Sequence, residues 1–159
     1  IEADAGLADS RAFARLREEG IRPEPGPGHA PEWTPELLLW RLARPGFRYW
    51  IHTTAGLTVI STRTEVAGLP FGVVLKTLAR PGHEPLPSGG AVAASVARTH
   101  RTPLVIHWGR TPWVRYRGVP LPQSRMPSPL ALVLHRHHDG FDEDSFELSA
   151  FEFLDFDAY

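Results

Sequence analysis

The sequence predicts an α/β domain in which helices flank a mixed, mostly antiparallel sheet. Three β-type segments, residues 47–53, 57–65 and 71–78, follow one another with only short turns between them, which predicts an antiparallel meander. An Ala-rich helical segment, residues 89–100, then precedes a short apolar segment at residues 103–108. A helix between two strands predicts a crossover connection and therefore one parallel pair of strands.

The N-terminal part is predicted to hold two helices separated by a loop. Asp9 or Ser10 can cap a helix that continues to Glu19, before a glycine. Residues 22–31 are rich in Pro and Gly and are expected to form a loop. Thr34 is a good N-cap and Pro35 suits the first position of a second helix. We therefore expect an N-terminal helix and linker over residues 1–33 and the main domain over residues 34–159.

The remaining helices and strands are predicted from the hydrophobic pattern and from residues that favour turns or helix ends. The first meander segment alternates aromatic or apolar side chains with polar ones, the second is rich in β-branched residues, and the third is almost continuously apolar. Ser88 is expected to cap the Ala-rich helix. Beyond residue 108 we expect one or two helical turns at 111–117, a strand at 130–135, a polar loop at 137–144 and a strand region at 145–156.

Composition narrows the possible functions. The chain has no cysteine, which excludes disulfides and cysteine–zinc sites, and no apolar run long enough to cross a bilayer. Its first residues lack the pattern of a signal peptide. No Walker loop, nucleophile elbow or nucleic-acid-binding motif is present. We therefore expect a cytoplasmic protein that binds neither membrane nor nucleic acid.

Charge is unevenly distributed although the net charge is only −1. Residues 76–125 carry eight basic side chains against one acidic side chain, whereas residues 139–159 carry eight acids and no Lys or Arg. The basic region can attract an anionic ligand such as a phosphate-bearing cofactor. Alternatively, the two regions face each other or face water.

Several segments, in this order, resemble the GNAT-type N-acyltransferase superfamily. The resemblance is one of sequence pattern and covers roughly residues 35–159. The segments that carry it are Trp40 to Trp50 (WRLARPGFRYW), Trp108 to Val119 (WGRTPWVRYRGV), Phe146 to Ser149 (FELS) and Phe153 to Asp157 (FLDFD).

The resemblance implies a mixed sheet that splays between its fourth and fifth strands, with acetyl-CoA or another acyl-CoA in the cleft. These strands correspond to residues 71–78 and 103–108. In the superfamily, backbone N–H groups at the start of the following helix hold the cofactor's pyrophosphate, as the helix dipole favours. The implied cofactor-binding residues are Leu78, Arg80, Ser88, Gly89 and Gly90.

The loop at residues 80–91 departs from the superfamily pattern. It keeps the glycines, but it is longer and includes three prolines, which have no N–H to offer an anion. No clear first strand precedes Ser10. Both departures would also fit the degenerate half of a tandem GNAT protein, or a fragment.

The resemblance implies Tyr116 as general acid, and His107 at the end of the fifth strand could be the base. Glu65 is another possible base. Each residue also has a purely structural interpretation. Tyr116 could be packed by its ring, His107 could be a polar residue that ends a strand, and Glu65 could be a solvated turn residue. His135, His137 and Asp139 invite a metal hypothesis, but no complete ligand set is specified, so we expect no metal site.

Two functions therefore remain open. The first is acyl-CoA-dependent transfer to the amine of an unidentified small molecule or protein. The second is a non-catalytic GNAT-like module that binds a partner protein, or completes a larger protein or homodimer through an exposed sheet edge. An open cleft beside residues 80–91 would favour the enzyme, whereas Pro85, Leu86 and Pro87 filling that cleft would favour the module.

Overall fold

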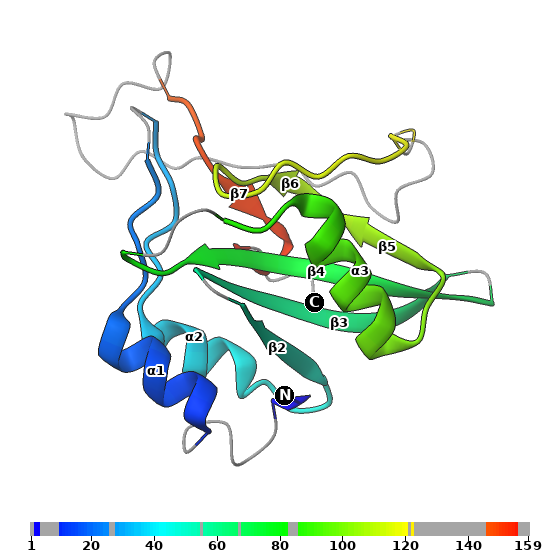
Figure 1. Cartoon of the computed structure of the whole chain (residues 1–159), viewed down its shortest axis with the longest axis horizontal. Coiled ribbons are helices and arrows are strands. Elements are labelled where there is room, and N and C mark those ends of the chain that lie inside the picture. Colours follow the sequence, from blue (N-terminus) through cyan, green and yellow to red (C-terminus); the bar gives the residue numbers. More distant parts are fainter. Residues whose placement is uncertain are drawn as a thin grey trace.

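The computed structural model places helices on both faces of a mixed sheet (Figure 1). It describes residues 2–3, 10–25, 28–54, 56–66, 68–82, 86–120, 122 and 146–155. The helices are α1 (Arg11–Glu19), α2 (Pro35–Leu42), α3 (Gly89–His100) and the short 3-10 helix η3 (Phe153–Asp155). The strands are β1 (Glu2–Ala3), β2 (Tyr49–Thr53), β3 (Leu57–Val66), β4 (Leu69–Ala79), β5 (Leu104–His107), β6 (Gly109–Arg110) and β7 (Phe151–Glu152).

The main sheet has the strand order β1-β2-β3-β4-β5. All neighbouring pairs are antiparallel except β4 and β5, which are parallel and are joined through α3. The meander and the crossover that the sequence predicts are therefore confirmed, as is the mixed, mostly antiparallel α/β class. A separate two-stranded sheet pairs β6 with β7.

Strand β4 is longer than its parallel neighbour. The β4–β5 pairing begins at Phe71 opposite Leu104 and ends at Val74 opposite His107, whereas β4 continues to Ala79. The register between β3 and β4 shifts at this point, so that Leu75 has no cross-strand partner. Such a bulge bends the strand. Strand β5 ends at His107, opposite Val74, so among the described residues the edge of β4 beyond Val74 has no strand beside it and becomes available to other groups.

The predicted helix caps Thr34 and Ser88 are confirmed, and of the two candidates for the first helix Ser10 is the cap. The side chains of Ser10, Thr34 and Ser88 accept hydrogen bonds from the backbone N–H three residues further on, at 3.2, 3.2 and 3.3 Å. Each cap satisfies a donor that the helix itself leaves unpaired and contributes about 1 kcal/mol of stability.

Two cores lie on opposite faces of the sheet. Helix α3 packs on one face, whereas α1 and α2 pack side by side on the other (Figure 1). Helix α1 shares a single core with α2 and the sheet, so the first helix is part of the same packed unit as residues beyond 34. The α1–α2 core includes Phe13, Leu16, Leu38, Leu42, Ile51, Ile60 and Leu78, and the α3 core includes Leu57, Val59, Val74, Val92, Val96, Trp113 and Val114.

Three local expectations differ from the structure. Residues 111–117, predicted to form helical turns, are irregular, because this segment is held by burying Trp113 and Val114 against α3. The strand region predicted over 145–156 is reduced, among its described residues, to β7 followed by η3. Strand β1 pairs with β2 although the sequence did not indicate a strand there. The predictions at 130–135 and 137–144 lie outside the described residues.

No helix within the described ranges combines the length and the apolar character that crossing a membrane would require.

Candidate functional site

Charged side chains gather beside the part of β4 that extends past β5. Lys76 of β4 is fully buried, and its Nζ lies 3.0 Å from Asp155 Oδ2, 3.3 Å from Glu24 Oε1 and 3.8 Å from Glu152 Oε2. The three carboxylates come from the connection between α1 and α2, from β7 and from η3. We call these four residues the Lys76 cluster.

Further hydrogen bonds hold the carboxylates of the Lys76 cluster. Trp33 Nε1 donates to Asp155 Oδ1 at 2.6 Å, and the backbone N–H of Glu152 donates to Asp155 Oδ2 at 2.6 Å. The ammonium also lies 5.9 Å from the centre of the Trp33 ring, within the range of a cation–π interaction. Glu24 Oε2, by contrast, is buried and has no hydrogen-bond partner among the described residues.

The electrostatics of the cluster follow from one cation among three acids. Burial alone would lower the pKa of Lys76, but attraction by Asp155, Glu152 and Glu24 outweighs it and raises that pKa. Burial raises the pKa of Glu24, only partly opposed by Lys76. Lys76 therefore stays charged at neutral pH and does not offer the neutral amine that a nucleophile needs.

Glu152 also occupies the free edge of β4. Its carboxylate accepts the backbone N–H of Thr77 at 2.9 Å and the Thr77 hydroxyl at 3.0 Å. Two residues further along, the carbonyl of Ala79 accepts the backbone N–H of Arg22 at 2.9 Å. The chain's own groups therefore take the hydrogen-bonding positions of β4 at Thr77 and Ala79.

The structure brings the predicted acid and base together. The rings of His107 and Tyr116 stack with centroids 4.2 Å apart. His107 Nε2 lies 3.2 Å from Glu152 Oε1, and the Tyr116 hydroxyl lies 3.1 Å from Thr77 Oγ1. Burial raises the pKa of Tyr116 well above its usual value. Its phenol therefore holds its proton tightly, which makes it a weak general acid.

The five residues implied to bind the cofactor do not surround one cavity. Ser88, Gly89 and Gly90 begin α3, but a Cβ at Gly89 would lie 2.9 Å from both the Arg115 carbonyl carbon and the Tyr116 Cα. The backbone at residues 115–116 therefore packs against the first turn of α3.

The other two implied residues point elsewhere. Leu78 lies in the core beneath α1 and α2. The guanidinium of Arg80 binds Glu19 at 2.8 Å and also donates to the carbonyl of Thr54. Arg80 thus links the end of β4 to α1, and neither of these partners belongs to the start of α3.

Two hollows open near the sheet. One of about 290 Å³ lies between the α1–α2 connection and Leu78 and is bordered by Glu24 and Trp33. A larger groove of about 640 Å³ lies at the far end of β3, next to the C-terminal end of α3. Neither is lined by Ser88, Gly89, Gly90, His107 or Tyr116. The predicted base Glu65 lines the larger groove and is exposed.

Sequence reasoning missed the Lys76 cluster. Its signal was a lysine, the only one in the chain, inside the otherwise apolar segment of residues 71–78. A charged residue in a buried strand requires charged or polar partners. Its partners, at residues 24, 152 and 155, are too distant in the chain to be paired from spacing.

A second buried polar chain links β2, β3 and α3. Ser61 Oγ lies 2.6 Å from His52 Nε2 and 2.7 Å from His100 Nε2. Burial, assisted by the neighbouring His100, lowers the pKa of His52 to about 4. Burial and the charge of Arg63 lower the pKa of His100. Both imidazoles are therefore held neutral in the folded protein.

The neutral His52 makes stability dependent on pH. Its pKa is about 4 when folded against 6.5 as the unperturbed value, so the unfolded chain binds the additional proton as the pH falls below 6.5. The stabilisation is fully present above pH 6.5 and is lost toward pH 4. We expect His52 to account for about 2 kcal/mol of lost stability between pH 7 and 5.

Urea unfolding at several pH values checks this expectation, with His52→Gln as the comparison. The variant should show a shallower dependence on pH over the same window. Equal slopes for the two proteins would contradict the assignment of the titration to His52.

Within the ranges that the structure describes, no three His, Cys, Asp or Glu side chains are arranged to hold a metal ion. The histidines at 135 and 137 and the acid at 139 lie outside those ranges. Comparison of the chain with models of known families, with curated proteins and with solved structures finds no match.

Proposed function

We propose that the chain is a non-catalytic α/β module, of the GNAT-like type that its sequence resembles, which acts by binding a partner protein. The observation that carries this proposal is the closed edge of β4. Where the resemblance places acyl-CoA, Glu152 already holds Thr77 and the backbone of Arg22 already holds Ala79.

Opening that edge would be costly. A cofactor that paired with β4 would have to displace the carboxylate of Glu152, which also lies 3.8 Å from the buried Lys76 ammonium. Displacement would leave the backbone N–H of Thr77 and part of the Lys76 charge without a partner in a buried environment. Unpaired buried donors and charges cost several kcal/mol.

The start of α3 supports the same conclusion. An anion approaching a helix N-terminus needs access to the first free N–H groups. Gly89 is buried, and the backbone of Arg115 and Tyr116 packs against it. In addition, Leu86 of the Pro-rich loop packs against the α3 core. Pyrophosphate binding there would require this packing to separate.

One observation favours the second candidate, an acyl-CoA-dependent N-acyltransferase. His107 and Tyr116 stack at the end of β5, beside the free edge of β4, as a base and an acid for acyl transfer would. The raised pKa of Tyr116 and the bond between His107 and Glu152 work against this candidate.

A thermal-shift titration with acetyl-CoA separates the two candidates, because a ligand that binds only the folded state raises the melting temperature. We expect no change in Tm at millimolar acetyl-CoA. ATP at the same concentration controls for general attraction of phosphate by the basic residues. A Tm that rises with acetyl-CoA but not with ATP would support the acyltransferase and contradict the module.

A further inference from the structure

Strand β3 extends past its neighbour β2 and leaves an open edge. The β2–β3 pairing ends at Trp50 opposite Ser61, whereas β3 continues to Val66 and stays paired with β4 as far as Leu69. Thr62 Oγ1 donates to the backbone carbonyl of Arg48 at 2.8 Å, so the segment before β2 still lies beside Thr62. Among the described residues, no strand pairs with residues 63–66 on the side of β2. Alternate residues of such an edge direct their N–H and C=O groups outward, which makes it a template for another strand.

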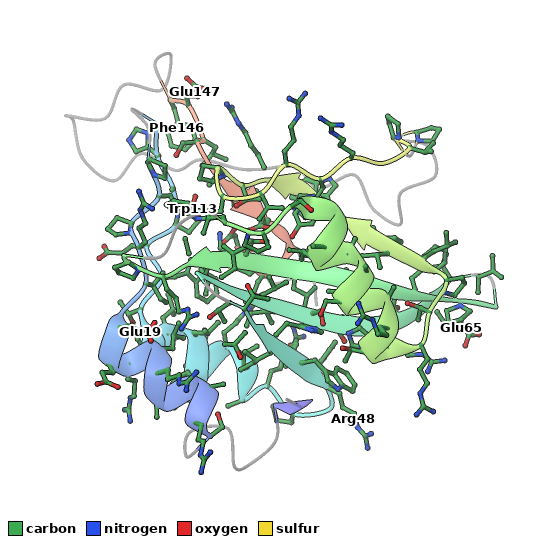
Figure 2. The ribbon with its side chains drawn as sticks, viewed as in Figure 1. Glu19, Arg48, Glu65, Trp113, Phe146 and Glu147 are labelled. Atoms are coloured by element: carbon green, nitrogen blue, oxygen red, sulfur yellow. The ribbon has the colours of Figure 1, made fainter. Side chains whose placement is uncertain are left out.

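A groove of about 640 Å³ follows this open edge, and we call it the β3-edge groove. In Figure 2, Arg48 and Glu65 lie on either side of the C-terminal end of α3, and Thr99, His100 and Arg101 of that end line the groove. Its lining comes from the turn before β2, from β2, from the end of β3 and from the end of α3: Gly46, Phe47, Arg48, Trp50, Thr62, Arg63, Thr64, Glu65, Thr99, His100 and Arg101.

The β3-edge groove is positively charged in a chain whose net charge is −1. Arg48, Arg63 and Arg101 line it and are exposed, against the single acid Glu65. Burial and the positive charge of Arg63 lower the pKa of His100, which also lines the groove.

Two features give the groove a fixed shape. Arg101 caps α3 in a left-handed conformation with φ of 53°, so its position is set by the helix end. The Trp50 ring packs edge-on against His100, at 4.6 Å between centroids, and this pair forms part of the wall. A preformed site loses less entropy on binding than a flexible one.

We propose that the β3-edge groove binds an extended acidic segment of a partner protein, which adds to the sheet as a strand beside residues 63–66. This inference deepens the proposed function, on which it rests, by naming the surface and the chemistry of the partner. Backbone pairing supplies affinity, and the exposed Arg63 and Arg101 select carboxylates on the incoming strand. Nucleic acid fits less well, because it cannot satisfy the open backbone groups and would place phosphates near Glu65.

Fluorescence anisotropy with a labelled synthetic peptide tests the proposal. The probe is an extended peptide of about seven residues that alternates Glu with Thr or Val, a length typical of a strand. One comparison peptide replaces every Glu with Gln, and another carries N-methyl groups on alternate backbone amides. The Gln peptide removes charge, whereas the N-methyl peptide keeps the charge and blocks strand pairing.

We expect the acidic peptide to bind saturably, and both comparison peptides to bind about tenfold more weakly or worse. Arg63→Glu should weaken binding of the acidic peptide by about tenfold or more, since interface arginines often dominate binding. Arg15→Glu, an equal change of charge on the exposed face of α1, should leave binding unchanged. Both positions are exposed, so thermal unfolding should confirm that both variants stay folded.

Three outcomes would overturn the inference. If the N-methyl peptide bound as tightly as the unmodified acidic peptide, binding would depend on charge alone and not on strand addition. Tighter binding of a single-stranded oligonucleotide would indicate a nucleic-acid surface. No binding of the acidic peptide would remove the groove as the docking site. None of these changes the acetyl-CoA titration, so failure of the groove and failure of the proposed function are distinguishable.

Discussion

Replacing Lys76 with methionine is expected to lower the free energy of unfolding by about 3–5 kcal/mol. Methionine has a similar length and fits the volume, but it removes the ammonium that pairs with three buried carboxylates. Each acid would then have to ionise without a counter-charge or take up a proton at neutral pH. Urea unfolding followed by tryptophan fluorescence measures the loss.

A surface cation provides the matched control. Arg17 forms an ion pair with Glu36 at 3.8 Å, but both side chains are more than half exposed. Exposed pairs contribute little, so Arg17→Met should change stability by less than about 1 kcal/mol. A Lys76→Met variant as stable as Arg17→Met would contradict the buried cluster.

Replacing Gly89 with alanine is expected to cost about 3 kcal/mol, whereas Gly90→Ala should cost nothing. A Cβ at Gly89 would meet the backbone of Arg115 and Tyr116, which cannot move aside as the end of a side chain can. A Cβ at Gly90 meets only the Ser88 hydroxyl, at 3.9 Å, and alanine stabilises a helix relative to glycine by roughly 0.5–1 kcal/mol.

The comparison of these neighbouring glycines separates packing from an anion cradle. If the first turn of α3 were open to a phosphate, both substitutions would be tolerated for stability. Similar unfolding free energies for Gly89→Ala and Gly90→Ala would therefore contradict the packing of residues 115–116 on α3.

The local elements could be predicted because their signals are local. The caps at Ser10, Thr34 and Ser88 lie within three residues of the groups that they satisfy. The meander follows from short turns between β-type segments, and the parallel β4–β5 pair follows from the intervening helix. Each of these inferences uses only neighbouring residues.

The irregular segment at residues 111–117 shows where local signals fail. Its composition permits a helical turn, but burying Trp113 and Val114 against α3 decides its path. The bulge at Leu75 likewise depends on the register with β3, which a single strand sequence does not encode. Tertiary packing overrode local preference in both cases.

The candidate site could be predicted only in pieces. His107 and Tyr116, assigned as base and acid, do lie together, whereas Leu78, Arg80 and the start of α3 are in different surroundings. The residue that links the site, Glu152, drew no prediction, because its role depends on contacts with β4 far back in the chain.

The closed edge of β4 is tested most directly by amide hydrogen exchange at Thr77. A backbone N–H that donates to a fully buried carboxylate should exchange only when the protein opens around it, so Thr77 should be among the slowest amides. Exchange of Thr77 within seconds, as at a solvent-exposed strand edge, would contradict the account.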